Sequence, residues 1–520
     1  MRTCLMIAAI LASGLGCARS PADPARNLEE RIHGVTDGAM GSPLAARMAQ
    51  ERVPGVSVAV IDDYDLAWAT GHGVASVDSH DPVTPETLFL ASSISKGVTS
   101  TVVLQLANEG LVDLDDKVND RLVSWRIPNN AYTARAAVSL RQLLGHAACV
   151  NRPDGGFGRE GNYPTTVQIL NGERPATNAP ARVECLPGSE LRYSNFGYVI
   201  VQQLIEDVTG ESFPQVAQST VLAPLGMASS TFEQPLSIAL EDRAAVPHDL
   251  EGRARPRSYN PNAVAQGGLW TTPSDLARFA IEIMRAQAGR PSRVLTQAMT
   301  REMLTPQYRQ LEGGNYWGLG FLVLGDWAVL QAGSDPGFRS LLAAFPTRGQ
   351  GIVVMVNGEG GELLQLRLLL NFIVEYVLVP IRGRVVAGGL AIALLLSAVV
   401  TWPLGALVRA LRRRVRAAVP ASREASRRTR GARVLATLTA VAVLGTAYPY
   451  VACAIDPQRS RGIVAAAVAL CAVLSLVLVF LAVRAWKEEH WSMAGRVHFS
   501  LVTLAAVVGS VLWLELIQLL

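Results

Sequence analysis

The C-terminal third of the chain is dominated by long uncharged stretches. Three runs of 24, 22 and 22 residues carry no charge: residues 385–408, 434–455 and 462–483. As a helix, each run is long enough to cross a bilayer core of about 30 Å, and buried helices of soluble proteins seldom stay uncharged for so long. A fourth run, residues 497–520, gives a weaker signal because His498 and Glu515 interrupt it. We therefore expect an all-α membrane region of three transmembrane helices, with residues 497–520 as a candidate fourth.

Alternating hydrophobic and polar positions predict strands at both ends of the region that precedes these runs. Near its start, GVSVAVI and LAWATGHGVA flank the polar stretch DDYD, which indicates a hairpin. Near its end, GFLVLGDWAVLQAG and LLAAFPTRGQGIVVMVNG repeat the pattern, with turns at Gly325-Asp326 and at residues 347–351. Both ends of the region are therefore predicted to be β-structure.

Between these strands the hydrophobic positions recur at helical spacing. Four segments have a period of 3.6 residues: TSTVVLQLANEG, VSLRQLLGHAA, YVIVQQLIEDVTG and SDLARFAIEIMRAQ. Residues 151–187 are rich in Gly, Pro and Asn and predict a long loop. The amphipathic segment 363–378 contains Arg367 and Glu375, so we interpret it as the last helix of the domain rather than as a membrane span. The pattern predicts one α+β domain over residues 25–380.

The first 18 residues have the pattern of a secretory signal peptide. One arginine precedes the apolar stretch CLMIAAILASGLG, which is too short to span a membrane comfortably and is followed by small residues. Cys17 resembles the lipidated cysteine of bacterial lipoproteins, although Gly14 and Leu15 depart from that motif. Cleavage after Ala18 is the alternative, and the sequence leaves both open.

Composition and charge agree with an exported domain on a membrane anchor. Half of the residues are hydrophobic and 17% are charged, which is too apolar for a purely soluble protein of 520 residues. Residues 409–433 contain ten arginines and one acid, Glu424, and so carry a net charge of +9. Between two spans, such a cluster is typical of a cytoplasmic loop rather than of a nucleic-acid site. We expect residues 18–380 on the periplasmic or extracellular side of a multi-pass protein in the lipid of the bacterial inner membrane.

Two cysteines are candidates for a disulfide. Of the six cysteines, two lie in the signal region and two in the uncharged runs, which leaves Cys149 and Cys185 in the exported domain. Oxidation is permitted in that compartment. We expect these two residues to be joined, with two buried thiols as the alternative.

Ser93 and Lys96 form the first candidate for catalysis. The chain has only three lysines among 47 basic residues, so lysine is seldom used here as a generic cation. Arginine cannot give up its proton, whereas a lysine amine can be brought toward neutrality by its surroundings. At a spacing of three residues on a helix, the two side chains share a face, close enough for the amine to take the hydroxyl proton. The stretch SISK is therefore a candidate nucleophile with its base, and an ordinary solvated lysine is the alternative.

Two further motifs follow in order along the chain. Tyr193-Ser194-Asn195 stands just before a predicted helix, and a predicted strand ends in Gln331-Ala332-Gly333. Serine with lysine, then Tyr-x-Asn, then a strand ending in x-x-Gly is the ordered triple of the penicillin-recognising serine hydrolases, which this sequence resembles over roughly residues 45–375. The class C β-lactamases and the related esterases, D-amino-acid peptidases and DD-peptidases are the most similar. Four supporting stretches lie in the same order: LRQLLGHAA, APLGMASSTF, GGLWTTPSDLARF and YWGLGF.

The resemblance implies a fold and a role for each motif residue. The terminal strands would form one sheet, with helices on the other side and the site between them. Ser93 would be acylated, Lys96 would help to remove its proton, and Tyr193 would act as general base or as acid to the leaving group. Asn195 would orient Lys96 and the substrate; taken alone, Tyr193 and Asn195 would instead be a packing tyrosine and a helix N-cap. The backbone N–H groups of Ser93 and Ser334, the latter next to Gly333, would form the oxyanion hole.

One position departs from the pattern. Residue 331 is usually lysine in the β-lactamases and often histidine in the esterase and peptidase relatives, but here it is Gln331. In the β-lactamases that lysine places a positive charge where the substrate carboxylate sits. Arg339, in PGFRS, is the candidate that would restore part of this charge.

The sequence therefore predicts a membrane-anchored serine hydrolase that acts on a small-molecule, peptide or ester substrate. No histidine or cysteine spacing implies a metal, and no dinucleotide or phosphate loop implies a cofactor. We expect His146, in LLGHAAC, to pack against its helix or cap the helix end. The alternative function is a non-catalytic or slowly deacylating sensor of cell-wall fragments or β-lactams that signals through the membrane helices.

Overall fold

The computed structural model describes residues 28–37, 43–153, 162–307, 315–325 and 327–377. The signal region with Cys17, the four apolar runs and the Arg-rich loop lie outside these residues. Among the residues that the structure describes, no helix combines the length and the apolar character needed to cross a bilayer.

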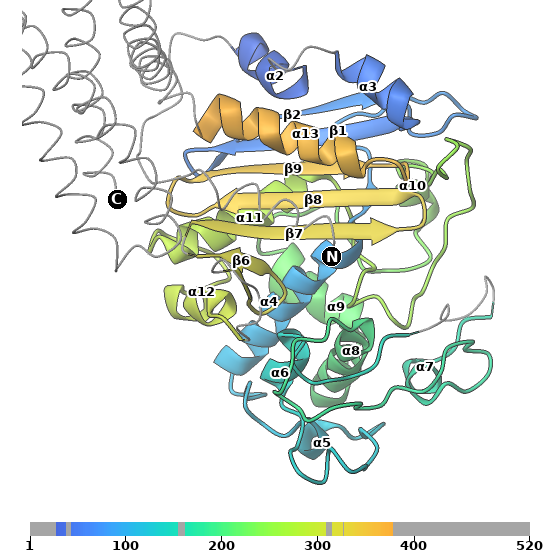
Figure 1. Cartoon of the computed structure of the whole chain (residues 1–520), viewed down its shortest axis with the longest axis vertical. Helices are drawn as coiled ribbons and strands as arrows, with labels where there is room; N and C mark the ends of the chain where they lie inside the picture. Colours follow the sequence, from blue (N-terminus) through green and yellow to red (C-terminus); the bar gives the residue numbers. More distant parts are fainter. Residues whose placement is uncertain (1–27, 38–42, 154–161, 308–314, 326, 378–520) are drawn as a thin grey trace, which may run out of the picture. The chain divides into compact units, whose positions relative to one another are not determined.

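The core of the described region is one seven-stranded sheet in the order β2-β1-β9-β8-β7-β6-β5 (Figure 1). All neighbouring strands in it pair antiparallel. The strands are β1 (Gly55–Asp62), β2 (Asp65–Gly73), β5 (Asn315–Trp317), β6 (Leu322–Leu324), β7 (Ala328–Asp335), β8 (Phe338–Phe345) and β9 (Gln350–Val356). The pairing of β1 with β9 confirms that the N-terminal hairpin and the C-terminal strands share a sheet.

Helices cover both faces of this sheet. On one face lies α13 (Glu362–Phe372), flanked by α2 (Leu28–Thr36) and α3 (Leu44–Glu51), and on the other lies α11 (Pro273–Gln287) (Figure 1). Burial on both faces explains why β8 and β9 are almost continuously apolar. The segment predicted over residues 363–378 is α13 followed by one π-helical turn, and it packs on the sheet as expected.

The remaining helices form a second layer beside β7, around the almost fully buried α4 (Ser95–Asn108). They are α5 (Val118–Arg121), α6 (Leu140–Leu144), α7 (Thr166–Asn171), α8 (Asn195–Thr209), α9 (Phe213–Ala217), α10 (Ile238–Glu241) and α12 (Gln297–Leu304), with a small ladder of β3 (Phe89–Leu90) and β4 (Trp270–Thr271). The prediction of a loop throughout residues 151–187 was wrong in one respect, because it contains α7. Thr165 starts that helix through a capping box with Gln168.

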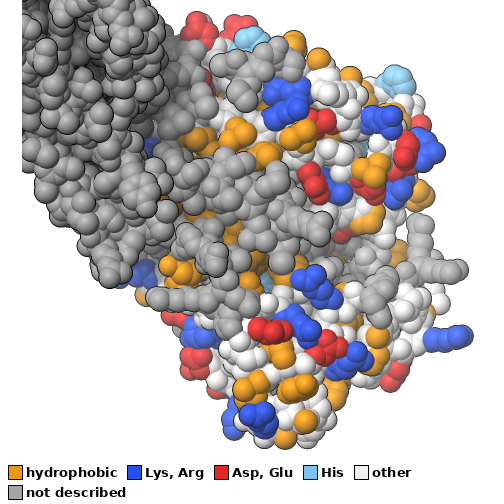
Figure 2. All heavy atoms as spheres, in the orientation of Figure 1, with side chains coloured by type: hydrophobic (Ala, Val, Ile, Leu, Met, Phe, Trp, Pro, Cys, Tyr) orange, Lys and Arg blue, Asp and Glu red, His pale blue; other side chains and the backbone are white. Residues whose placement is uncertain are grey.

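The sequence-predicted helices differ from the observed ones mainly in length. The helix predicted in VSLRQLLGHAA ends at Leu144, because His146 has a left-handed backbone that cannot continue the helix. The resulting fold is α+β, as the sequence predicts. In Figure 2, basic and acidic side chains lie interspersed over the described parts of the face shown.

Candidate active site

Ser93 lies at the junction between the sheet and the helical layer. It belongs to a 3₁₀ turn, Ser92–Ile94, that leads directly into α4 and packs against β7. Gly333 of β7 makes this approach possible, since a Cβ there would lie 2.3 Å from the Ala91 carbonyl oxygen and 2.1 Å from Ser340 Oγ. Ser92 has a φ of +50°, a backbone conformation that non-glycine residues adopt at a cost. The turn that presents Ser93 is therefore held by its neighbours on β7 and β8.

Lys96 is fully buried beside Ser93. Its Nζ donates a hydrogen bond of 3.1 Å to Ser93 Oγ and one of 2.5 Å to the backbone carbonyl of Gln266. The same nitrogen lies 5.0 Å from the centre of the Tyr193 ring. Such burial is costly for a lysine that has no partner. The hydroxyl, the carbonyl and the ring face therefore fix the amine against the nucleophile.

Tyr193 completes this group from the opposite side. Its hydroxyl lies 2.8 Å from Ser93 Oγ and donates to it. The residue stands just ahead of α8, in a chain segment of its own that reaches the site from 100 positions further along the sequence. Ser93 Oγ is thus within hydrogen-bond distance of two groups that can take or return its proton, which is the geometry of an activated serine nucleophile.

Asn195 lies at the start of α8, and its role in orienting Lys96 stays a prediction. It is the first residue of α8, whose N-cap is Ser194, and no hydrogen bond joins it to Lys96 in the described structure. The amine instead binds the Gln266 carbonyl, which the sequence analysis missed because every residue carries such a group. Asn195 Oδ1 is buried with no partner among the described residues.

Gln331 faces Ser93 but binds its backbone. Its side chain is buried, and Nε2 donates a 3.0 Å hydrogen bond to the Ser93 carbonyl. A carbonyl oxygen can only accept a hydrogen bond, so the amide nitrogen of Gln331 must point toward it. The amide oxygen, Oε1, therefore points away from this carbonyl. That oxygen is buried without a partner in the described part of the chain. The β-lactamase lysine position is therefore occupied here by an acceptor.

Arg339 does not line the site. It follows Phe338 on β8, and its side chain forms an ion pair of 3.3 Å with Glu362 of α13 on the far face of the sheet. The adjacent Ser340 points the other way and donates 2.6 Å to the Ala91 carbonyl beside Ser93. Alternation along the strand thus turns Arg339 toward α13, and its Nη1 also donates 2.8 Å to the backbone carbonyl of Asp335 at the end of β7. The suggestion that it supplies part of the missing charge stays a prediction.

The end of β7 carries the oxyanion position and an acid. Ser334, exposed, follows Gly333 and pairs with Arg339 in the ladder. Asp335 lies two residues after Gly333 and so projects from the same face of the strand. Burial raises the pKa of the Asp335 carboxyl to about 6, although the charges of Arg339 and Lys96 oppose the change.

His146 supports Tyr193 from behind. The two rings lie 4.2 Å apart, and His146 Nδ1 accepts from the Ser194 N–H at 3.3 Å. Burial, aided by the charges of Lys96 and Arg152, holds the pKa of the imidazole well below its usual range, so the ring is neutral. His146 therefore packs against Tyr193, in addition to its expected position at the end of α6.

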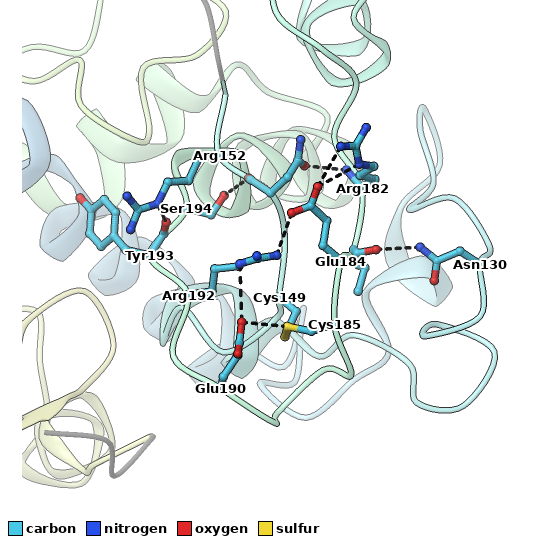
Figure 3. Close-up of polar contacts among 12 residues, drawn as sticks. Asn130, Cys149, Arg152, Arg182, Glu184, Cys185, Glu190, Arg192, Tyr193 and Ser194 are labelled. Atoms are coloured by element: carbon cyan, nitrogen blue, oxygen red, sulfur yellow. Dashed lines mark hydrogen bonds and ion pairs between the residues drawn. A yellow bond between two sulfur atoms is a disulfide. The ribbon is translucent and has the colours of Figure 1, made fainter.

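A disulfide joins the segments on which His146 and Tyr193 lie. Cys149 and Cys185 are bonded to each other, which confirms the predicted pairing (Figure 3). Glu190 lies near this pair, but two bonded sulfurs are not thiolate metal ligands. Nearby, the Ser194 hydroxyl donates 2.6 Å to the Asn151 carbonyl. Covalent and polar links therefore hold this side of the site.

We refer to residues 146–152 and 182–194 as the loop wall, and to residues 331–335 of β7 as the sheet wall.

Comparison with known proteins supports this geometry. Residues 43–372 match the Beta-lactamase family. The chain is 23% identical to protein flp of Staphylococcus aureus over 314 residues, 59% of this chain and 60% of that protein. It is 24% identical to the unguisins hydrolase ungD of Aspergillus violaceofuscus over 370 residues, 61% of each chain. It therefore spans about 60% of the length of these curated relatives.

A solved structure agrees with the sequence matches. The octameric penicillin-binding protein homologue of Pyrococcus abyssi superposes with a TM-score of 0.52 at 26% identity, over 62% of this chain and 74% of that one. The family match covers more than half of the sequence and contains all the residues described above. The chain belongs to the beta-lactamase family, whose members are serine hydrolases.

Proposed function

We propose that this protein is an exported, membrane-anchored serine hydrolase that cleaves an ester or amide through an acyl-enzyme. The observation that carries the proposal is the position of Ser93 Oγ, 3.1 Å from Lys96 Nζ and 2.8 Å from the Tyr193 hydroxyl. The export and the anchor rest on the signal pattern and the uncharged runs of the sequence.

In the proposed reaction, Ser93 Oγ bonds to the acyl carbon while its proton passes to Tyr193 or Lys96. The carbonyl oxygen takes the negative charge and is stabilised by the backbone N–H groups of Ser93 and Ser334. As the tetrahedral intermediate collapses, the bond to the leaving oxygen or nitrogen breaks, and that atom receives the proton. Water then attacks the acyl-enzyme, gives its proton to the same groups, and releases the acid with Ser93 restored.

The sheet wall favours neutral groups over carboxylates. Gln331 offers a free amide oxygen at the position where a β-lactamase offers an ammonium group. An acceptor can bind an N–H of the substrate but provides no charge-assisted bond to a carboxylate. We therefore propose esterase or peptidase activity, with β-lactams as poor substrates.

The nucleophile is tested by mass spectrometry after incubation with a fluorophosphonate, a penicillin and a panel of acyl esters. We expect one adduct on Ser93, and Ser93→Ala should remove it without changing the thermal midpoint. Ser95, buried two residues away, is the matched serine for the peptide map. An adduct that persists in Ser93→Ala or maps to Ser95 would contradict the assignment, and an adduct that never turns over would support the sensor instead.

The anchoring is tested separately with reporter fusions. A reporter fused after Glu424 should behave as cytoplasmic, and one fused near Gln458 as external. A truncated protein of residues 20–380 should be soluble and retain esterase activity, because it contains the seven-stranded sheet and the helices on both of its faces. Opposite reporter results would overturn the orientation, and an unfolded truncated protein would show that the apolar runs complete the core.

A further inference from the structure

The arginines of the loop wall differ in what they bind. Arg182 pairs with Glu184 at 2.9 Å, and Arg192 pairs with the same carboxylate at 2.8 Å (Figure 3). Arg152 instead donates from Nε to the backbone carbonyl of Tyr193 at 2.7 Å. Among the described residues it has no carboxylate partner. It is thus the arginine of this wall that binds a backbone carbonyl rather than a described carboxylate.

The contact also fixes where the charge lies. Arg152 is exposed and is anchored on the main chain of the residue whose hydroxyl contacts Ser93 Oγ. Its guanidinium lies beside Tyr193 in Figure 3. Only one of its five N–H donors is used in this contact. The remaining donors form a planar edge of the kind that binds carboxylates with two parallel hydrogen bonds.

An independent effect places this charge close to the reacting groups. Burial holds the pKa of the His146 imidazole low, and the charges of Lys96 and then Arg152 lower it further; this ring packs on the Tyr193 ring. A free surface arginine of no functional use would be solvated away from the site. This guanidinium is held next to it by a hydrogen bond.

We infer that Arg152 binds a carboxylate of the substrate on the loop-wall side of Ser93. The inference rests on the proposed function and specifies its substrate class: esters or amides whose acyl group carries a carboxylate. On the sheet wall, the acceptor Oε1 of Gln331 and the acid Asp335 disfavour a carboxylate. The positive charge that would recognise the substrate therefore lies on the loop wall, whereas the β-lactamases carry it at position 331 of the sheet wall.

The test compares two esters with the purified full chain in detergent. Mono-(4-nitrophenyl) glutarate carries the carboxylate, and its methyl ester, 4-nitrophenyl methyl glutarate, is the neutral match. The readout is the ratio of the two kcat/KM values, because any loss of Tyr193 positioning lowers both rates and cancels in the ratio. We expect the native protein to favour the anionic ester by about tenfold or more.

Three variants decide the origin of that ratio. Arg152→Gln should lower it by about tenfold, Arg152→Glu should invert it, and Arg152→Lys should keep most of it. Arg182→Gln, which removes a paired arginine of the same wall, is the control and should leave the ratio unchanged. Added salt should reduce the native ratio and have little effect on that of Arg152→Gln.

The outcomes separate the two proposals. A ratio that is the same in Arg152→Gln, Arg152→Glu and the native protein would overturn the inference, while hydrolysis of the neutral ester would still support a serine hydrolase. If neither ester is cleaved and Ser93 takes no fluorophosphonate, the proposed function fails and the inference fails with it. Thermal midpoints of all variants should agree with the native value, since Arg152 is exposed.

Discussion

The sheet wall and the loop wall of the site hold their functional groups by different means. On the sheet wall, Gln331, Gly333 and Ser334 belong to a β-ladder between β7 and β8, so their backbone is fixed by regular hydrogen bonds. On the loop wall, Tyr193 lies in irregular chain that is fixed by a disulfide, by the ring of His146 and by side-chain bonds to carbonyls.

This difference has a chemical consequence. The sheet wall presents an amide, backbone N–H groups and one acid, Asp335, whose positions follow from strand register. The loop wall carries the Tyr193 hydroxyl, which lies 2.8 Å from Ser93 Oγ, and the cation Arg152, which has no carboxylate partner among the described residues. Positions held by a ladder tolerate exchange of one side chain, because the backbone stays in place. Groups on the loop wall are held by individual contacts, so the loss of one such contact should have a larger effect than a substitution on the sheet wall.

The largest effect is expected on removing the tyrosine hydroxyl. Tyr193→Phe keeps the ring that packs on His146 but deletes the group 2.8 Å from Ser93 Oγ. Acylation by the neutral ester should fall by about two orders of magnitude or more, as is typical for loss of a general base, and Lys96→Ala should do the same. Burst kinetics measure the acylation step. A loss of less than about threefold in Tyr193→Phe would move the base role to Lys96 alone.

The disulfide is the next test of the loop wall. It closes a loop of 36 residues that ends close to Tyr193, and removing such a bond costs about 2–4 kcal/mol of unfolding free energy. The double variant Cys149→Ser, Cys185→Ser should lower the midpoint of denaturant unfolding and slow acylation. Reduction of the native protein should do likewise and expose two thiols to labelling. If thiol labelling is the same before and after reduction, the bond is absent from the purified protein.

The residues that could be predicted from the sequence also differ between the two walls. Ser93, Lys96 and Tyr193 were found because their motifs have fixed local spacing and order, and the structure brings their side chains together. The Gln266 carbonyl could not be found, since a backbone group leaves no trace in residue type. Arg152 was not singled out, because its place depends on how an irregular loop folds back.

On the sheet wall, the face that Arg339 occupies could not be predicted from the sequence. The sequence placed it near Gln331 along the chain, but the face it occupies depends on the register between β7 and β8, in which Ser334 pairs with Arg339. Its neighbour Ser340 faces the site, so Arg339 must face α13. If one residue of β8 had been known to face Ser93, the alternation of side chains along the strand would have been enough to predict the face on which Arg339 lies.

A smaller effect is expected on returning the β-lactamase residue to the sheet wall. Gln331→Lys replaces a free acceptor with a cation while keeping a donor toward the Ser93 carbonyl. Acylation by a penicillin should accelerate by about one to two decades, which corresponds to roughly 1.5–3 kcal/mol for a charge-assisted hydrogen bond. The adduct is followed by mass spectrometry over time. Efficient penicillin turnover by the native protein, with no gain in the variant, would show that this wall does not set the preference.

The smallest effect concerns Asp335, at the end of the same wall. Its pKa in the folded protein is about 6, above the ordinary value near 3.8, so folding favours the protonated carboxyl. The sign follows from linkage: this contribution to stability is present at low pH and is lost as the pH rises through about 6. Asp335→Asn removes the charge and the titration together.

Asp335→Asn should therefore match the native unfolding free energy near pH 4 and exceed it near pH 8. Full burial would make the difference about 3 kcal/mol, and the partial exposure of this side chain reduces it to roughly 1 kcal/mol. Denaturant unfolding at the two pH values measures it, with Asp65→Asn on the exposed start of β2 as the control, because Asp65 is mostly exposed. Equal stability of variant and native protein at both pH values would mean that the carboxylate is solvated. The sheet wall would then keep its negative charge down to about pH 4, and would discriminate against β-lactam carboxylates over that wider pH range.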